Sequence, residues 1–468
     1  MKSRFWPILR TSVPILRTSV PILVDFGAQV LMWTIEPMLV GHLALRVMGR
    51  FYPGLGATGV DALTAVGSVV QVILFTCTIL LTFVLGATML INKLLGAGKR
   101  DEADHFLGQT LFTAMFPAVG IALIWYFLSP VIFRTLLGAS PAVTAISVDY
   151  MRVIAWFAPF ILMNFVAIGI VRGAGDTHLS MMVGLLVNGI HLVLAICLIR
   201  GIWFFPELGV RGAAYAAAIG HTIGFFFTYS VILRGKSVLT FKSYDFRSIK
   251  RRSIWRIIKT GTPSTLEQLA WMTGITIVIG FSNRLGSTQA AAHIVALTFH
   301  RLFAVMYLAF GMGALTLVGQ RYGAQEYTRA RHLVHMFVWL IFGVVTFLAS
   351  AIFFRAKYFV ILFTTDPDVM PLCIEILKII AFVQVPKAMS YILSFSLRGV
   401  GENRYPMYLA FVGVFAIEVF LGFNLAFIFG MSLAGLWIAA IIDEVLKVLL
   451  GARRFRRRIK ALVEGRIE

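Results

Sequence analysis

Charged residues are scarce in this chain, and acidic residues are the scarcest. Asp, Glu, Lys and Arg make up 13% of the 468 residues, with 21 acidic residues against 42 basic ones. A soluble domain carries about 25% charged residues. Apolar residues reach 59%, and the mean hydropathy is +0.87. The shortage of charge excludes an ordinary soluble globular protein and predicts a membrane protein.

Cysteine is nearly absent, and the common catalytic motifs are missing. Cys77, Cys197 and Cys373 lie in separate apolar runs and form no CxxC pattern. We expect them to be reduced packing residues. The chain also has no HExxH, GxSxG or P-loop motif and no paired His/Cys metal spacing. An intramembrane enzyme is therefore disfavoured, and no cofactor is expected.

Long apolar runs, by contrast, are abundant. A helix needs about 20 mostly apolar residues to cross the hydrocarbon core of a membrane. Twelve segments qualify, at residues 20–45, 62–91, 106–136, 146–170, 179–200, 210–233, 258–281, 289–318, 333–356, 372–397, 405–429 and 432–451. Their apolar residues are continuous rather than alternating, which argues against a β-barrel. The sequence predicts an all-α polytopic membrane protein with twelve transmembrane helices.

The basic residues are concentrated in three segments. These segments precede the first span, connect the sixth span to the seventh, and form the C-terminal tail, at residues 2–17, 236–259 and 453–460. With twelve spans they share one side of the membrane, which the positive-inside rule makes cytoplasmic. We expect a multi-pass protein of the cell membrane with both termini in the cytoplasm. The basic excess fits anionic lipid headgroups rather than nucleic acid.

Short strings recur at corresponding places in the two halves. Residues 172–177 read RGAGDT, and residues 398–403, 226 positions later, read RGVGEN. Gly96 and Gly323, 227 positions apart, follow the second and eighth spans. This repetition predicts two six-helix bundles related by a pseudo-two-fold axis along the membrane normal. The expected lobes are residues 1–234 and 258–468, joined by a basic cytoplasmic linker at 235–257.

Several strings together resemble the MATE (multidrug and toxic compound extrusion) transporters over essentially the whole chain. They read LVGHL at 39–43, GAG at 96–98, RGAGDT at 172–177, GVRGAA at 209–214 and VGQRYGA at 318–324. The motif residues singled out are Gly96, Arg172, Gly175, Asp176, Gly323, Arg398 and Gly401. We expect most of them to build the scaffold, since glycines allow tight turns and close helix packing.

The resemblance also implies a function. MATE proteins are two-lobed antiporters that expel small organic cations or amphiphilic drugs in exchange for H⁺ or Na⁺. Such compounds and the membrane lipids are the expected partners, the coupling ion is H⁺ or Na⁺, and the protein is expected to be a monomer.

Glu36 is the foremost candidate for ion coupling. It interrupts the apolar run VLMWTIEPMLV at residues 30–40. An ionisable group deep in a span costs about 2.5–3.5 kcal/mol on insertion scales and marks a functional site by default. Pro37 removes a backbone N–H beside it, and Pro37 and Pro21 are both expected to bend the helix. The MATE pattern resembles this span, with an acid at this position, so Glu36 is expected to hold H⁺ or Na⁺; the alternative is a glutamate buried for packing alone.

Two further acids lie inside spans. Glu267 is early in the seventh span, where MATE proteins often carry an acid, and Glu418 lies in the apolar run of the eleventh. Both are candidates for coupling, although Glu267 is alternatively solvated at the membrane interface. Lys387, in the tenth span, either lines a cavity or snorkels toward the cytoplasm. Asp25, near the cytoplasmic end of the first span, is expected to be hydrated.

The fifth span departs from the family pattern. In one branch it carries an Asn and, one turn later, an Asp that act with the first-helix acid. Asn188 matches the Asn, but Leu192 occupies the second position, which puts a network between the first and fifth spans in question. His191 is either a substitute titrating group or a hydrogen-bonded packing residue, and the second interpretation is favoured.

Aromatic and methionine side chains suit a cavity for flat, amphiphilic cations. The candidate lining residues are Trp33, Phe157, Phe160, Met163, Trp271, Met272 and Met306. Each of them alternatively faces lipid or a neighbouring helix.

A second transport function is also open. Related two-bundle proteins flip lipid-linked saccharides, and such a protein favours a basic central cavity that holds phosphate. The mid-span charges of this chain include acids with few bases, which favours the cation antiporter.

Overall fold

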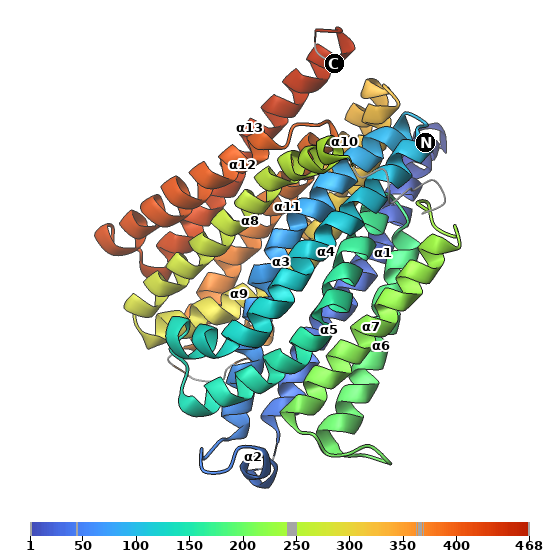
Figure 1. The fold of residues 1–468 in the computed structure, drawn as a ribbon. Coiled ribbons are helices and arrows are strands. Elements are labelled where there is room, and N and C mark those ends of the chain that lie inside the picture. Colours follow the sequence, from blue (N-terminus) through green and yellow to red (C-terminus); the bar gives the residue numbers. More distant parts are fainter. Residues whose placement is uncertain are drawn as a thin grey trace. The chain divides into compact units, whose positions relative to one another are not determined.

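The computed structural model consists of helices (Figure 1). It describes residues 2–43, 45–240, 250–361, 363, 367 and 369–466, and the side chains of these residues except 2–12, 45 and 46. No strand occurs in this described part of the chain. The all-α prediction is therefore confirmed, while residues 241–249 of the predicted linker lie outside the described residues.

The first half contains six long helical segments. They are α1 (Lys2–Gly41), α3 (Gly59–Gly96), α4 (Arg100–Val131) with its π-helical end η1 (Ile132–Leu136), α5 (Pro141–Gly173), α6 (Thr177–Arg200) and α7 (Val210–Leu233). The short α2 (Leu45–Phe51) connects α1 to α3.

The second half repeats this order. Its segments are α8 (Arg251–Arg284), α9 (Ser287–Gly323), α10 (Tyr327–Ile361), α11 (Met370–Gly399), α12 (Arg404–Phe411) with η3 (Val412–Leu421) and η4 (Asn424–Ile428), and α13 (Ser432–Val463). Each of the twelve predicted spans falls on one of these helical segments, and most helices extend beyond the apolar run.

The first span differs most from its prediction. Residues 20–45 were expected to be helical, whereas α1 begins at Lys2 and ends at Gly41. Its helical conformation continues through both Pro21 and Pro37. The predicted bends at these prolines stay a prediction.

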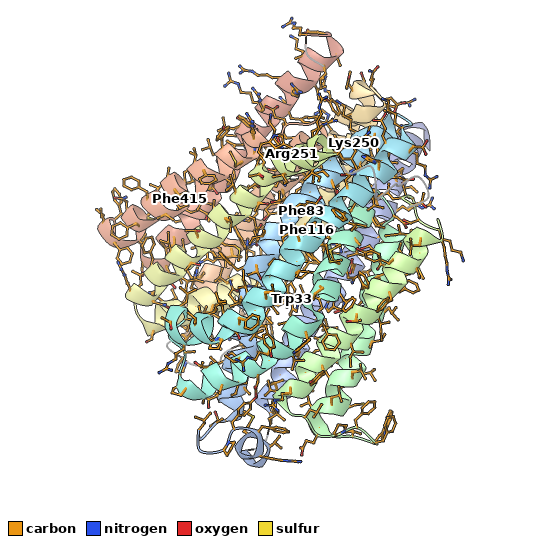
Figure 2. All side chains as sticks on the ribbon, in the orientation of Figure 1. Trp33, Phe83, Phe116, Lys250, Arg251 and Phe415 are labelled. Carbon is orange, nitrogen blue, oxygen red and sulfur yellow. The ribbon has the colours of Figure 1, made fainter. Side chains whose placement is uncertain are left out.

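Nine helices of the described residues are long and apolar enough to cross a membrane. The other three long helices, α8, α11 and α13, carry charged side chains within their apolar runs, such as Glu267, Lys387 and Glu444. Elsewhere large apolar side chains cover the outside of the helices, as in Phe116 (Figure 2), which is 65% exposed. A membrane protein is expected to present such side chains to lipid. Lys250 and Arg251 lie where α8 begins.

The described residues form two compact units. The N-terminal unit comprises residues 24–91 and 100–261, and the C-terminal unit comprises residues 1–23, 92–99 and 262–468. The core of the C-terminal unit includes Ile15 from α1 as well as Phe337 and Ile392 from α10 and α11. The start of α1 therefore packs with helices of the second half of the chain.

Gly96 and Gly323, which follow the second and eighth spans, make a reciprocal contact within the C-terminal unit. A Cβ on Gly96 would lie 1.9 Å from the carbonyl oxygen of Gln320, and a Cβ on Gly323 would lie 2.0 Å from that of Lys93. Only glycine allows two helix backbones to approach this closely. The contact relates residues 93 and 96 to 320 and 323, so it follows the 227-residue repeat.

The RGxG strings end the fourth helix of each half. Gly175 and Gly401 have φ angles of 106° and 80°, which favour glycine. Asp176 then caps α6, because its Oδ1 accepts a hydrogen bond of 3.3 Å from the backbone N–H of Leu179. The string therefore ends one helix and begins the next. Its arginine lies in the last turn of the helix that ends, α5 or α11.

Candidate functional site

Glu36 lies on α1 in the interior of the N-terminal unit. Its side chain is 3% exposed. Tyr150 on α5 donates a hydrogen bond of 2.6 Å from its hydroxyl to Glu36 Oε1. Nε2 of His191, on α6, lies 3.5 Å from Glu36 Oε2. Within the described part of the chain, no lysine or arginine pairs with this carboxyl group.

A cavity of about 230 Å³ surrounds this carboxyl group inside the N-terminal unit. Its walls combine aromatic and polar side chains from α1, α3, α4, α5, α6 and α7, among them Phe26, Trp33, Trp125, Tyr150, Phe165, Asn188, His191 and His221. Asp25 and Arg172 also line this cavity, where they pair with each other. Glu36 is therefore the carboxylate that remains for a cation, and the aromatic faces suit an amphiphilic molecule.

The neighbours of Glu36 on α6 differ from the family pattern in an unexpected way. Asn188 lines the same cavity, but its amide donates to the carbonyl oxygen of Gly184 at 2.8 Å, one turn earlier. His191 is 6% exposed and faces Glu36, although its place on the helix suggested a packing role. The first and fifth spans therefore do meet at Glu36, through His191 in place of the missing Asp.

Asp25 is buried rather than hydrated, so the prediction for this residue is wrong. It is 6% exposed, and Arg172 Nη2 lies 3.1 Å from its Oδ2. Ser180 donates a hydrogen bond of 2.6 Å to the same oxygen, and Arg172 Nε donates to Ser180 Oγ at 2.8 Å. The arginine stacks over Phe26 at 4.5 Å from the ring centroid. The nearby positive charge of Arg172, whose side chain is 13% exposed, explains why this acid is held in the interior.

Glu267 has the corresponding partner in the C-terminal unit. Arg398 Nη2 lies 2.5 Å from Glu267 Oε2, and the arginine side chain is 5% exposed. Arg398 also stacks over Phe395, at 4.7 Å from the centroid. In each half, the arginine of the RGxG string therefore pairs with an acid on the first span of that half. Glu267 is anchored to a base and is not a freely solvated interface residue.

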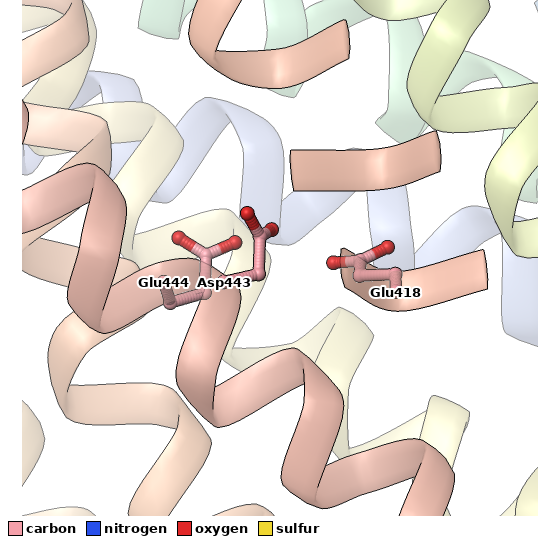
Figure 3. Close-up of side chains that lie close together, drawn as sticks. All are labelled: Glu418, Asp443 and Glu444. Atoms are coloured by element: carbon pink, nitrogen blue, oxygen red, sulfur yellow. The ribbon is translucent and has the colours of Figure 1, made fainter. Parts of the chain in front are cut away.

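Glu418 belongs to a larger group of charged side chains in the C-terminal unit. Oxygen atoms of Glu418, Asp443 and Glu444 all lie within 4.8 Å of one another (Figure 3). Lys387 Nζ lies 2.9 Å from Glu444 Oε1, and Lys447 pairs with Asp443. Lys387 is 5% exposed, so it lines the interior and does not snorkel.

Sequence reasoning missed Asp443, Glu444 and Lys447. The signal was present, since these residues interrupt the apolar run at 432–451. An acid and a lysine four positions apart, however, are also typical of a solvated helix face. Only the packing of α13 against α11 and η3 shows that Asp443 and Glu444 are buried.

The predicted cavity residues divide into two groups. Trp33 lines the cavity at Glu36, and Trp271 lines a smaller cavity next to Glu418. Phe157, Phe160, Met163, Met272 and Met306 are not among the residues that line these two cavities. Their contact with a substrate stays a prediction.

Comparison with known families supports the resemblance found in the sequence. The family model MatE matches the chain twice, over residues 54–197 and residues 263–424. One match lies in each half, as the internal repeat predicts.

Individual relatives agree with the family match. A Bacillus subtilis protein named "Probable multidrug resistance protein YoeA" is 25% identical over 403 residues, which cover 86% of this chain and 85% of that protein. A Thermotoga maritima protein named "Probable multidrug resistance protein NorM" is 26% identical over 430 residues, covering 90% and 87% of the two chains. Both alignments extend over most of each protein.

A solved structure shows the same fold. It is described as the outward-facing conformation of a multidrug resistance MATE family transporter of the MOP superfamily. The two structures superpose with a TM-score of 0.85 at 22% sequence identity and 96% coverage of each chain. The prediction of an all-α, two-bundle membrane fold is confirmed. With the family model matching both halves, this chain belongs to the MatE family of membrane transporters.

Proposed function

We propose that this protein is a secondary antiporter that exports organic cations or amphiphilic drugs, and that Glu36 is its coupling carboxylate. The observation that carries the proposal is a buried acid that pairs with no lysine or arginine of the described residues, placed in a cavity with aromatic walls. The multidrug resistance names of the relatives support the substrate class.

Burial dictates what Glu36 does. A charged carboxylate inside a span is costly, by about 2.5–3.5 kcal/mol on insertion scales. The hydroxyl of Tyr150 stabilises Glu36 Oε1 with a hydrogen bond but brings no charge. The group therefore needs a cation, which is either a bound ion or the positive charge of a substrate. Because one carboxylate accommodates one of the two at a time, ion binding expels the substrate and substrate binding expels the ion.

The neighbours of Glu36 favour a proton as the coupling ion. Alkali-metal ions are hard and prefer several oxygen ligands, whereas the group next to Oε2 is the imidazole of His191. An imidazole beside a carboxyl group suits proton relay. Sodium coupling is the alternative outcome of the experiment below.

Transport requires a further conformational state. The cavity at Glu36 measures about 230 Å³, while pockets for drug-sized ligands span about 300–1,000 Å³. The site must therefore open to admit substrate and close again, as alternating access between two repeats provides. We further propose that both termini and the basic linker face the cytoplasm of the cell membrane, so that export proceeds away from the basic side.

Efflux of a fluorescent organic cation from proteoliposomes, measured separately under a pH gradient and a Na⁺ gradient, tests the proposal. We expect the pH gradient to drive efflux through the wild-type protein, Glu36→Gln to abolish it, and Glu36→Asp to retain part of it. Glu375→Gln, which removes an exposed acid of α11, is the matched control and should transport normally. Unimpaired coupling in Glu36→Gln would contradict the role of Glu36. Absence of cation transport by the wild type, together with thermal stabilisation by a polyprenyl pyrophosphate, would indicate the lipid flippase instead.

A further inference from the structure

The C-terminal unit has an apolar groove of about 640 Å³ between α10, α11 and α13. Thr346 and Ser350 are the two polar residues among the described residues that line it. The small side chain of Ala349 is buried at its floor, and the rings of Phe354 and Phe382 are exposed at its rim. A groove of this composition suits a hydrocarbon chain rather than a polar molecule.

We propose that this groove holds one acyl chain of an anionic phospholipid, whose headgroup lies between Arg331 on α10 and Arg456 on α13. The length of the groove, the order of side chains along the two helices and the charge at one end all fit this ligand. The proposal does not depend on the transport function, because the groove shares no residue with the cavity at Glu36.

The groove is about as long as one membrane leaflet is thick. On α10 its lining extends from Phe342 to Phe354, which is about 18 Å at a helical rise of about 1.5 Å per residue. The hydrocarbon core of a bilayer is about 30 Å thick, so each leaflet contributes about 15 Å. An acyl chain therefore fits along the groove with its headgroup beyond one end.

The face of α10 that lines the groove changes character toward the N-terminal end of the helix. Phe342 is the lining residue of α10 nearest to that end. Trp339, His335 and Arg331 continue the same face, because they lie three, seven and eleven positions before Phe342. Trp339 is 69% exposed, and its ring meets that of Phe342 edge-on with centroids 5.7 Å apart. An exposed tryptophan between apolar and basic side chains is typical of the membrane–water interface.

The helix α13 has the same order of side chains in the opposite chain direction. Leu449 is its groove residue nearest to the C-terminal end. The exposed Arg453 and Arg456, four and seven positions later, continue the face of Leu449. Leu449 and Arg456 are seven positions apart, as are Phe342 and His335, which is about 10 Å along a helix. The basic side chains of both helices therefore lie at a similar distance beyond the groove.

These basic side chains of α10 and α13 are close to one another. The charges of Arg331 and Arg456 both act on the imidazole of His335. Phe337 and Phe455 belong to the same buried core, so the two helices pack together beside these side chains. A phosphate group placed here meets arginines from both helices, and the planar guanidinium group suits phosphate oxygens.

Negative charge is scarce at this end of the groove. The exposed Arg331, Arg453 and Arg456 pair with no acid in the described part of the chain, whereas the neighbouring Arg454 pairs with Glu402. Clusters of basic residues beside a transmembrane helix attract anionic lipids. The unpaired arginines therefore supply the charge complementarity that an anionic headgroup needs.

The opposite end of the groove has charges of both signs. Lys378 Nζ lies 5.9 Å from the ring centroid of Phe353, which lines the groove. Glu375 lies one turn before Lys378, and both side chains are exposed. Arg355 and Lys357 are also exposed, near the C-terminal end of α10. Because an acid lies among these basic side chains, this end is less favourable for an anionic headgroup than the end with the unpaired arginines.

Native mass spectrometry of the purified, delipidated full-length protein in detergent, titrated with phosphatidylglycerol or phosphatidylcholine, tests the proposal. The first lipid is anionic, and the second is a zwitterion with the same acyl chains. We expect one phosphatidylglycerol per chain to bind in preference to phosphatidylcholine. Equal binding of the two lipids without a saturable first site would show ordinary contact with bulk lipid only and would overturn the proposal.

Variants test the headgroup and the acyl chain separately. Arg331→Gln combined with Arg456→Gln should weaken the binding of phosphatidylglycerol about 30-fold, since each basic residue near a membrane surface contributes about a factor of five. Lys357→Gln combined with Lys378→Gln removes the same charge at the opposite end, so this matched control should bind like the wild type. Ser350→Phe fills the groove and should weaken binding with every basic side chain in place.

Thermal unfolding of the same proteins checks that the variants fold. Arg331 and Arg456 are exposed and form no ion pair among the described residues, so their double variant should unfold at the wild-type temperature without lipid. Added phosphatidylglycerol should raise the unfolding temperature of the wild type and of the control more than that of the double variant. Ser350→Phe carries the test if the double variant fails to fold. Undiminished binding in either of them, or an equal loss in the control, would contradict the proposed site.

Discussion

Glu36 in the N-terminal unit has a tyrosine hydroxyl and an imidazole as its neighbours, whereas Glu444 in the C-terminal unit is held by Lys387 and Ser390. Both carboxyl groups are nearly completely buried. The difference lies in the fixed positive charge, which is present at Glu444 and missing at Glu36. A buried acid with a lysine partner has its charge compensated within the protein, whereas one without a lysine or arginine needs a positive charge from another source.

The scaffold of the two halves is much more alike than their buried acids. Gly96 and Gly323 make reciprocal contacts, and Arg172 and Arg398 each pair with an acid of the first span in their half. No counterpart of the lysines of α11 and α13 pairs with Glu36 in the described residues. Repetition therefore explains how the helices are held, and the departures from repetition lie at the buried carboxyl groups.

The largest loss of stability is expected from removing Lys387, the fixed positive charge that pairs with Glu444. Lys387→Met leaves this buried carboxylate short of its partner, and breaking a buried pair costs about 3–5 kcal/mol. Glu36→Gln, which breaks no ion pair with a lysine or arginine, should change the free energy of unfolding by about 1 kcal/mol or less. Thermal unfolding in detergent measures the contrast. Adding Glu444→Gln to Lys387→Met should recover most of the loss, and equal stability of Lys387→Met and wild type would contradict the comparison.

The next largest loss of stability is expected from adding a side chain where two helix backbones approach closely, at Gly96 and Gly323. Gly96→Ala and Gly323→Ala each place a Cβ within about 2 Å of a backbone carbonyl, so the helices must separate. Overpacking costs about 1–3 kcal/mol, and a clash with backbone belongs at the upper end. Because the contact is reciprocal, the two variants should lose similar amounts of folded protein in size-exclusion chromatography. Gly98→Ala is not a suitable control because of its φ angle of 73°; Gly120→Ala, with open space around it, should be tolerated.

Replacing the arginine of each arginine–acid pair should lower the stability of the protein by modestly different amounts. Arg398→Ala removes the arginine that pairs with Glu267, while after Arg172→Ala the Ser180 hydroxyl still donates to Asp25. Hydrogen bonds to charged groups contribute about 1.5–3 kcal/mol, so Arg398→Ala should destabilise by about 2 kcal/mol and Arg172→Ala by about 1 kcal/mol. Parallel thermal unfolding of the two variants checks the order. A larger loss in Arg172→Ala would show that Ser180 does not compensate.

A small effect on stability is also expected at Tyr150. Tyr150→Phe removes one neutral donor to Glu36, which is worth about 1 kcal/mol. Transport should persist, but its pH dependence should shift, because the ionised form of Glu36 loses a hydrogen bond and binds a proton more readily. The rate of pH-driven efflux against pH measures the shift, which should be toward higher pH. An unchanged profile would place Tyr150 outside the coupling site.

Hydropathy was sufficient to predict twelve helical spans, and a lone acid in an apolar run was sufficient to single out Glu36. The arginine–acid pairs were not predictable, since Arg172 lies 147 positions after Asp25 and its motif pointed to the scaffold. His191 faces Glu36 because of how α1 and α6 pack, and no pattern along α6 indicates that orientation. Asp443 and Lys447 have the spacing of a surface pair, so only the tertiary packing reveals their burial.

The central claim is that the carboxyl group of Glu36 holds either the coupling ion or the substrate. The most direct measurement is ion release when an organic cation is added to the purified protein in weakly buffered detergent solution, followed with a pH indicator and a Na⁺-selective electrode. The account predicts that wild-type protein releases a proton as substrate binds and that Glu36→Gln releases none. Substrate binding without release of either ion from the wild type, or equal release from Glu36→Gln, would contradict it.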